Sequence, residues 1–510
     1  MPKFVSAKEA VAAIADHATV ALDGFTMMGV AEAVEEEIER AFLASGHPRD
    51  LVLVHAAGQS NRRQGFEHFA HTGLAARVVG SHWGLMPRMS AFLAADETQA
   101  VCLPQGQLSH LYRAIAAGRP GNLTRIGLRT FVDPRVEGGK INRSAREKSP
   151  DYVELINVKS EDHILYRTFP IDVGVIRATS VDEAGNTSQE EEAVTLDALG
   201  IAQAARNSGG LVICQAKRRV PKGAIAPKDV TVPGSLIDLV VIAADPDRQH
   251  RQTDRTAFDP IYITAPHRGL DRELPPVPMS SRLAIGRRAV RFLHQHDVVN
   301  IGTGIPGDTV GPALHEAGVL DQVTLTVESG VYGGIPAGGV DFGIAAYPDA
   351  IMPHPTQFDF YNGGGLDATF MGAGQIDRLG NVNVSLLGDR VIGCGGFIDI
   401  TQSAKRVIFC FSMEGRHSKF VPDVGHLTFS GEQALNNGQQ VIYVSERAVF
   451  RLQADGLHLV EVAPGVEPSD VLSAMPFSVK VESPLGRFPA EIFEPQVQSF
   501  SLETRGGAIQ

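Results

Sequence analysis

The sequence predicts an α/β protein made of two related open domains whose sheets are largely parallel. Three observations predict this class. Short apolar runs rich in β-branched residues alternate with helical stretches along most of the 510 residues. Glycine and proline, at 53 and 30 residues, follow no period and punctuate turns in the manner of a globular chain. The two halves also share a weak internal repeat, described below.

The elements of the first half are predicted in chain order. Residues 20–22 form a strand that enters a glycine turn at Gly24 and Gly29. Residues 31–43 form a helix, because acidic residues in its early turns suit the positive end of a helix dipole. Three apolar runs are then predicted as buried strands: 51–54, 211–213 and 239–242.

A proline-rich stretch separates the halves. Pro266, Pro275, Pro276 and Pro278 fall among charged residues, and prolines at this density remove amide donors and disfavour regular structure. We therefore expect an N-terminal domain at 1–265, a linker at 266–281 and a C-terminal domain at 282–510.

The second half begins with a predicted helix at 282–296 and a strand at 297–301. The strand enters Gly302-Thr303-Gly304-Ile305-Pro306-Gly307, followed by a short helix from 308 to 316. A strand at 322–327 then ends at Glu328, and residues 407–409 form a later buried strand.

The internal repeat joins two features of each half. A strand entering a glycine turn is followed later by D-x-x-G-N, at 182–186 in the first half and at 377–381 in the second. The order agrees but the spacing differs. A duplicated domain with an insertion in the first copy explains this pattern, and chance recurrence of a common turn explains it equally well.

Charge and hydropathy exclude several classes of function. The net charge of −12 lacks the cationic footprint that nucleic acids and anionic membranes require, although a local basic pocket for a phosphorylated ligand stays possible. No stretch of about 20 apolar residues predicts a transmembrane helix, and the N-terminus has no signal-peptide core. We therefore expect a cytoplasmic protein with no nucleic-acid or membrane partner.

Metal and disulfide chemistry is not predicted either. The four cysteines (Cys102, Cys214, Cys394 and Cys410) are scattered among apolar or glycine neighbours and are expected to be buried thiols. The histidine pairs 68/71 and 294/296 have no third ligand nearby, so no metal site is expected. Neither G-x-S-x-G nor a P-loop occurs, which argues against a serine hydrolase or a P-loop ATPase.

The densest candidate site lies in the second half. The run 302–307 matches G-x-G-x-x-G after a strand, with Glu328 more than 20 residues on, which is the pattern of a dinucleotide site. Pro306 weakens that interpretation because it has no amide to offer a pyrophosphate. Alternatively, Glu328 at the carboxyl end of a strand is itself the reactive group, or simply a solvated acid before a turn.

Glycine clusters surround this candidate in the sequence. They lie at 329–334, 358–367 and 393–396, next to aromatic or apolar residues. Such loops expose amides that can bind an oxyanion or a phosphate, and they also serve as ordinary tight turns.

Several strings together resemble family I coenzyme A transferases over nearly the whole chain. The first half contributes residues 81–85, 103–108, 111–121 and 130–135, and the second half contributes 328–334, 358–367 and 393–396. The chain looks most like the fused propionate or acetate CoA-transferases. Where the 3-ketoacid branch has Ser-Glu-Asn-Gly, this chain has Val327-Glu328-Ser329-Gly330, which favours the short-chain acyl branch.

The resemblance implies roles for particular residues. Glu328 would be the nucleophile that forms a glutamyl-CoA thioester in a ping-pong reaction. Gln105 and a backbone amide at Gly395 or Gly396 would stabilise the oxyanion; taken on its own, Gln105 would be a polar turn residue. The candidates for lining the substrate cleft are Gly24, Gly29, Gly302, Gly304, Phe358 and Gly364.

The resemblance also implies the partners. Acyl-CoA and small carboxylic acids would be the substrates, with coenzyme A as a substrate and no separate cofactor, and the protein would be a homodimer or homotetramer. Four alternatives stay open: succinyl-CoA:3-ketoacid transfer, acyl-CoA hydrolysis on the same glutamate, an NAD-dependent oxidoreductase and a non-catalytic metabolite sensor.

Overall fold

The computed structural model describes residues 1–265, 277–414, 418–495 and 499–504, and the chain divides into two compact units. The first unit comprises Met1–Thr264 together with Ile351–Phe358 and Leu386–Asp399. The second unit comprises Ala265–Ala350, Asp359–Ser385 and Ile400–Gln510. Most of the predicted linker, residues 266–276, lies outside the described residues.

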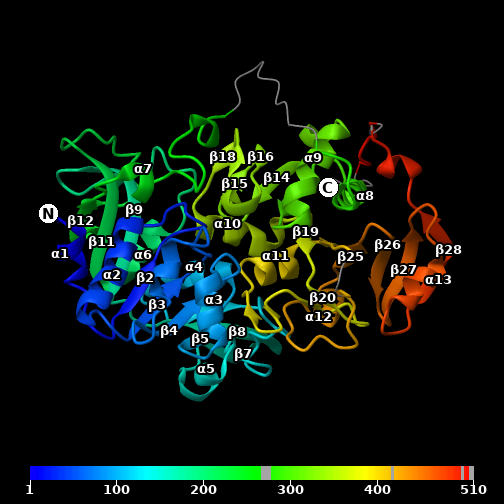
Figure 1. The fold of residues 1–510 in the computed structure, drawn as a ribbon, viewed down its shortest axis with the longest axis horizontal. Helices are drawn as coiled ribbons and strands as arrows, with labels where there is room; N and C mark the ends of the chain where they lie inside the picture. Colours follow the sequence, from blue (N-terminus) through cyan, green and yellow to red (C-terminus); the bar gives the residue numbers. More distant parts are fainter. Residues whose placement is uncertain (266–276, 415–417, 496–498, 505–510) are drawn as a thin grey trace. The chain divides into compact units, whose positions relative to one another are not determined.

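A parallel sheet forms the centre of the first unit. Its strand order is β1 (Lys3–Val5), β12 (Leu239–Ile242), β11 (Leu211–Val220), β9 (Val173–Asp182), β2 (Thr19–Leu22), β3 (Leu51–His55), β4 (Ala75–Gly80) and β5 (Gln99–Cys102). All these neighbours are parallel, and the short β10 (Thr187–Ser188) pairs antiparallel with β9. In Figure 1 the green strands β9, β11 and β12 lie beside the blue β2 and β3.

Helices and a small antiparallel sheet complete the first unit. The helices are α1 (Ala7–Val11), α2 (Glu32–Ser45), α3 (Pro87–Ala94), α4 (Gln105–Ala116), α5 (Arg143–Lys148), α6 (Ala198–Asn207) and α7 (Pro246–Gln249). The small sheet has the order β6 (Gly121–Thr124), β8 (Glu161–Arg167), β7 (Val153–Val158). α4 packs against α6, and α6 packs on β9. The later segments of the unit contribute the start of α10 (His354–Phe360), β22 (Leu386–Leu387), β23 (Arg390–Val391) and the start of α11 (Phe397–Ser403).

The second unit has a mixed sheet. Its order includes β15 (Val331–Tyr332), β14 (Thr324–Val327), β13 (Val298–Ile301), β19 (Ala368–Gly372), β24 (Arg406–Cys410), β25 (Gln440–Val444), β26 (Ala448–Gln453), β27 (Gly456–Val462) and β28 (Lys480–Arg487). The pairs from β14 to β25 are parallel, and β15, β26 and β27 join antiparallel. Its helices include α8 (Ser281–Ala289), α9 (Ile305–Glu316), α12 (Gly431–Asn436) and α13 (Pro468–Ser473).

The predicted fold class is confirmed, because both units are α/β with largely parallel sheets and each has its own apolar core. The predicted helix at 282–296 was too long. α8 ends at Ala289 and a short 3₁₀ turn follows at Val290–Phe292. The chain then turns because the Asp297 carboxylate accepts the His294 N–H at 2.9 Å. Within the described ranges, no helix is both long and apolar enough to cross a bilayer.

The two D-x-x-G-N segments form the same turn. In the first unit, one carboxylate oxygen of Asp182 accepts the Asn186 N–H at 2.9 Å, and the other accepts the Asn186 side-chain amide at 3.1 Å. In the second unit, Asp377 accepts the corresponding groups of Asn381 at 3.1 and 2.9 Å. The side-chain oxygen of each asparagine then accepts one glycine amide, from Gly234 at 3.0 Å or Gly431 at 2.9 Å. This agreement in detail favours duplication over chance recurrence.

Candidate active site

Glu328 follows the parallel strand β14 of the second unit. A side chain of the strand adds to the hydrogen bonds of its backbone. The Thr326 hydroxyl donates to the Val299 carbonyl at 3.0 Å and is hydrogen-bonded to the Tyr361 hydroxyl at 2.7 Å. Glu328 is 8% exposed. Its carboxyl group therefore stands largely out of water at the carboxyl end of a parallel strand, where open α/β sheets bind ligands.

The turn after Glu328 is held tightly. The Gly330 N–H donates to the Val327 carbonyl at 3.0 Å, and the Ser329 hydroxyl donates to the Gly343 carbonyl. Gly330 has φ 111°, in the region that favours glycine. A Cβ atom on Gly333 would lie 1.8 Å from a carboxylate oxygen of Asp349, so this glycine is required by packing. These contacts fix the backbone on which Glu328 is carried.

The glycine run at 302–307 begins α9. A Cβ on Gly302 would lie 2.7 Å from the Met371 sulfur, and its N–H donates to the Phe370 carbonyl at 2.8 Å. Gly304 has φ 82° and nothing near its missing Cβ, and the helix begins at Ile305, earlier than the predicted residue 308. Pro306 fits the first turn, where no intrahelical amide bond is needed.

Gln105 lies in the first unit as the first residue of α4 and is 2% exposed. Its backbone N–H donates to the Gly395 carbonyl at 3.0 Å. The next amide, that of Gly106, donates to the Asp399 carboxylate at 3.0 Å, which also accepts the Gln107 side-chain amide at 2.7 Å. The start of α4 is thus fastened to residues almost 300 positions later in the sequence.

The glycine loop at 393–396 packs closely on the segment after β4. A Cβ on Gly393 would lie 2.2 Å from the Ser81 carbonyl oxygen, and the Gly395 N–H donates to that same carbonyl at 2.9 Å. Both glycines have positive φ, at 82° and 53°. The structure therefore brings Gln105 and Gly395 together, but the Gly395 amide is already occupied by Ser81.

The remaining predicted residues differ in how closely they are packed. A Cβ on Gly24 would lie 2.8 Å from Val30 Cγ2, and one on Gly29 would lie 2.8 Å from Leu196 Cδ1. Phe358 is fully buried, and its ring lies 2.4 Å from the position that a Cβ on Gly106 would take. Gly364 belongs to the second unit with Glu328, and it has φ 86° with open space around it.

Sequence reasoning missed a chain of buried polar groups attached to Gln105. The Gln105 Nε2 lies 2.9 Å from the His354 Nε2, and the His354 Nδ1 lies 2.7 Å from the Asp197 carboxylate. The Asp197 N–H donates to the Asp23 carboxyl at 3.0 Å. Burial and the facing Asp197 raise the pKa of Asp23 well above its usual range. No sequence signal links these residues, because they are spread over more than 300 positions.

The four cysteines are buried as predicted, and His68 and His71 each lie beside a glutamate. His68 lies 3.0 Å from the Glu32 carboxylate, and His71 lies 2.6 Å from that of Glu39. In the part of the chain that the structure describes, no three histidine, cysteine or acidic side chains could together hold a metal ion. All four cysteines are buried thiols, with the Cys102 and Cys394 sulfurs 3.7 Å apart.

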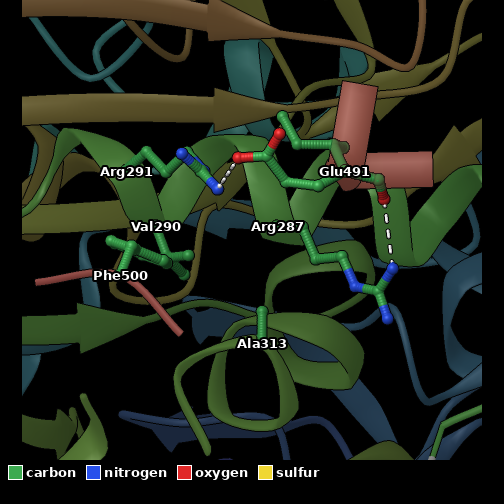
Figure 2. A pocket seen from close by; sticks show the side chains of 7 residues that line it. Arg287, Val290, Arg291, Ala313, Glu491 and Phe500 are labelled. Carbon is green, nitrogen blue, oxygen red and sulfur yellow. Dashed lines mark hydrogen bonds and ion pairs between the residues drawn. The ribbon is translucent and has the colours of Figure 1, made fainter. Parts of the chain in front are cut away.

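A small pocket beside α8 in the second unit is lined by Arg287 and Arg291, and both side chains have partners in that unit. Figure 2 shows Arg291 paired with the Glu491 carboxylate and Arg287 bonded to an oxygen atom. The Arg291–Glu491 distance is 2.9 Å, and the Arg287 guanidinium donates to the Ile492 carbonyl at 3.1 Å. The Arg287 guanidinium also pairs with Glu316 at 3.0 Å. These contacts fasten the segment around Glu491 and Ile492 to α8 and to the 3₁₀ turn that follows it.

Comparison with known proteins gives one consistent result. The sequence profile described as "Coenzyme A transferase" matches residues 4–243. A caffeate CoA-transferase of Acetobacterium woodii is 38% identical over 97% of this chain and 98% of its own length. The acetate CoA-transferase YdiF of Escherichia coli K12 is 36% identical over 98% of this chain and 96% of its own length.

A solved structure agrees with these relatives. The acyl-CoA transferase YdiF of Escherichia coli O157:H7, described as a thioester complex with CoA, superposes with a TM-score of 0.91 at 34% identity. The match covers 99% of this chain and 98% of that one.

Proposed function

The chain belongs to the coenzyme A transferase family, and we propose that it moves CoA from a short-chain acyl-CoA to an acetate- or propionate-type acid through a covalent intermediate on Glu328. The observation that carries the proposal is the position of Glu328: an 8%-exposed carboxyl group at the carboxyl end of β14, on a backbone fixed by the turn after it. A carboxylate is a weak nucleophile in water, so partial desolvation and fixed placement are what it needs.

The proposed reaction is balanced in two mirrored halves. A Glu328 oxygen attacks the thioester carbonyl carbon; the C–S bond breaks and CoA leaves as its thiolate, which gives a mixed anhydride. The thiolate then attacks the glutamyl carbonyl, the first acid leaves as its carboxylate, and a glutamyl-CoA thioester is formed. The incoming carboxylate repeats these steps in reverse and restores Glu328. No net proton or electron is exchanged, and the kinetics are ping-pong.

Each addition places negative charge on a carbonyl oxygen, which requires hydrogen-bond donors. We assign one donor to the side-chain amide of Gln105. Of the two backbone amides that the sequence left open, we assign the role to Gly396, because the Gly395 N–H is bonded to the Ser81 carbonyl. Phe358, Gly24, Gly29, Gly302, Gly304 and Gly364 stay predictions as cleft residues. The homodimeric or homotetrameric state and the cytoplasmic location also stay predictions.

The acyl group is the finer part of the proposal. One relative is named for caffeate and another for acetate, at nearly equal identity. Competition among acetate, propionate, succinate, acetoacetate and caffeate as acceptors tests it directly. We expect the highest kcat/KM for acetate or propionate. Preference for succinate or acetoacetate would favour the 3-ketoacid alternative, and preference for caffeate would place this chain with the aromatic-acid enzyme.

Covalent trapping tests the mechanism. The protein is incubated with propionyl-CoA, treated with borohydride and digested, and the peptide that contains Glu328 is examined by mass spectrometry. We expect reduction of the Glu328 thioester to an alcohol, and loss of transfer by at least about 10³-fold in Glu328→Ala, since the covalent route is removed. Glu467→Gln, at an exposed position of the same unit, should keep full activity.

Three results would count against the proposed mechanism, two of them by supporting an alternative. An unmodified Glu328 peptide together with an active Glu328→Ala enzyme would exclude the glutamyl intermediate. Release of free CoA without an acceptor acid, at a rate matching transfer, would identify a hydrolase. A fluorescence change of NADH on mixing would support the dinucleotide alternative.

A further inference from the structure

A line of buried polar side chains in the first unit ends at Gln105 and takes no part in the covalent steps. Gln105, His354 and Asp197 are 2%, 1% and 5% exposed. Gln105 contacts His354 through side-chain nitrogens 2.9 Å apart, and His354 contacts Asp197 at 2.7 Å. All three belong to one unit: Gln105 and Asp197 lie in its segment Met1–Thr264, and His354 lies in Ile351–Phe358.

The hydrogen-bond chemistry fixes the direction of this line. Asp197, as a carboxylate, only accepts, so the His354 Nδ1 carries the proton that it receives. In the neutral imidazole the Nε2 then has a lone pair and accepts. An amide nitrogen only donates, so the Gln105 Nε2 is the matching partner. One tautomer of His354 therefore selects one orientation of the Gln105 amide.

The surroundings of His354 hold its ring in place. The ring meets Phe358 edge-on, with centroids 5.1 Å apart, and meets Phe25 edge-on at 6.4 Å. Its backbone N–H donates to the Leu196 carbonyl at 3.3 Å. The imidazole is thus packed between aromatic rings and anchored at its main chain, so it keeps its Nε2 directed at Gln105.

The surroundings of Asp197 keep the acceptor in place. The Ser109 hydroxyl donates to the second carboxylate oxygen of Asp197, and the Asp197 N–H donates to the Asp23 carboxyl group. Burial and the nearby Asp197 and Asp23 raise the pKa of the Tyr112 hydroxyl well above its usual range, so that group stays neutral. The Asp197 carboxyl group is thus held between Ser109 and His354, with one oxygen bonded to each.

We propose that His354 and Asp197 are positioning residues that hold the Gln105 amide in a single orientation, with its nitrogen on His354 and its oxygen on the side of Gly395. In this orientation one N–H of the amide is committed to His354 and the second is left for the oxyanion. A built Cβ on Gly395 lies 3.6 Å from the Gln105 Oε1, which shows that the amide oxygen faces that loop. The inference rests on the role proposed for Gln105.

The consequence is specific to Asp197→Asn. An asparagine can present an N–H to the His354 Nδ1, which moves the imidazole proton to Nε2 and makes that nitrogen a donor. Two donors then face each other, and the Gln105 amide must rotate and turn its oxygen toward His354. The donor intended for the oxyanion is displaced while the shapes of the side chains stay almost unchanged.

A double-mutant cycle on the full-length enzyme tests the inference. Gln105→Ala should lower kcat by about 10²–10³, the usual cost of one oxyanion donor. Asp197→Asn alone should lower kcat by about 10- to 100-fold with KM for acyl-CoA within about threefold, because it misdirects the same donor. The double variant should be no slower than Gln105→Ala alone. Ser109→Ala is a milder change at the same carboxylate and should lower kcat by a few-fold. In an enzyme that already carries Gln105→Ala, it should not lower kcat further.

Each result has a distinct meaning. Losses that multiply in the double variants would indicate a merely structural role and overturn the inference while leaving the role of Gln105 intact. Full activity in Gln105→Ala would overturn the inference together with the role of Gln105. An active Glu328→Ala would instead overturn the chemistry. If Asp197→Asn fails to fold by circular dichroism, the Ser109→Ala pair decides. Asp151→Asn, an exposed carboxylate of the same unit, is the control and should be unchanged.

Discussion

Glu35 is the residue at which burial has the clearest consequence for stability. It lies in α2 with no exposure, and neither carboxyl oxygen has a hydrogen-bond partner among the described residues. Burial and, secondarily, the neighbouring Glu32 raise the pKa of Glu35 to about 8. The folded protein therefore keeps this group protonated at pH 7, whereas the unfolded chain releases the proton near its usual pKa of 4.5.

This pKa predicts a loss of stability with rising pH. Between about pH 4.5 and 8 the folded state binds a proton that the unfolded state lacks, so Glu35 contributes less stability as pH rises, by up to about 1.4 kcal/mol per unit. This contribution is absent in Glu35→Gln. The free energy of unfolding of the variant should therefore rise relative to that of the wild type from pH 5 to 8. Urea denaturation at several pH values measures the difference, and a constant difference would contradict the prediction.

His68 acts in the same direction and serves as the internal check. Burial alone would lower its pKa, but the ion pairs with Glu32 and Glu39 raise the pKa of His68 to about 9. Its contribution is complete below about pH 6.5 and is lost as pH rises through 9. Because Glu35→Gln retains His68, both proteins should still lose stability together between pH 6.5 and 9.

At the scale of the element, the start of α4 shows why a glycine is placed where alanine would be the better helix former. A Cβ on Gly106 would lie 2.4 Å from the Phe358 ring and 2.7 Å from the Asp399 carboxylate. The same position donates its amide to Asp399. Close approach of the helix to these two side chains, and not helix propensity, selects the residue.

We predict that Gly106→Ala destabilises the protein by about 1–3 kcal/mol, the usual cost of overpacking. Gly200→Ala in α6 is the matched control, because the nearest atom to its Cβ would be Tyr112 Cβ at 3.4 Å. There the better helix propensity of alanine, worth up to about 1 kcal/mol, should make the change neutral or stabilising. Thermal and urea unfolding of both variants measures this, and equal effects at the two positions would refute the packing argument.

The repeated D-x-x-G-N turn shows what a short motif can predict. The motif determines its own turn. The aspartate accepts a hydrogen bond from the asparagine four residues later, and the glycine between them takes a positive φ, 90° at Gly185 and 73° at Gly380. The motif could not reveal that Gly234 and Gly431 donate their amides to the two asparagines, because these glycines lie 48 and 50 residues further along the chain.

At the scale of the whole molecule, the first unit is discontinuous in sequence. The segments Ile351–Phe358 and Leu386–Asp399 supply His354, the Gly395 carbonyl and the Asp399 carboxylate, each bonded to the start of α4. The second of these segments also places Val391, Cys394 and Ile398 in the apolar core of the unit. The first 264 residues therefore lack part of their own core and site.

We predict that a fragment of residues 1–264 does not reach the native state of the first unit. The amides of residues 105–108 should exchange with solvent at least about tenfold faster in the fragment, since the acceptors of Gln105 and Gly106 are missing. Hydrogen exchange with mass spectrometry measures this, and dye binding should report the exposed core. Co-expression with residues 265–510 should restore protection. A fragment with native protection and a cooperative transition would contradict the prediction.

The sequence by itself determined the α/β class, most of the central strands and the family, because these depend on local periodicity and on motifs that are short in sequence. The run 239–242 is a strand with the predicted bounds, and 51–54 extends by one residue to His55. Only the tertiary structure decided which groups surround Gln105. His354 contacts Gln105, Asp197 contacts His354, and Asp399 accepts the neighbouring Gly106 amide, each between segments that are far apart along the chain. These hydrogen-bond partners depend on burial and distance, which no local pattern records.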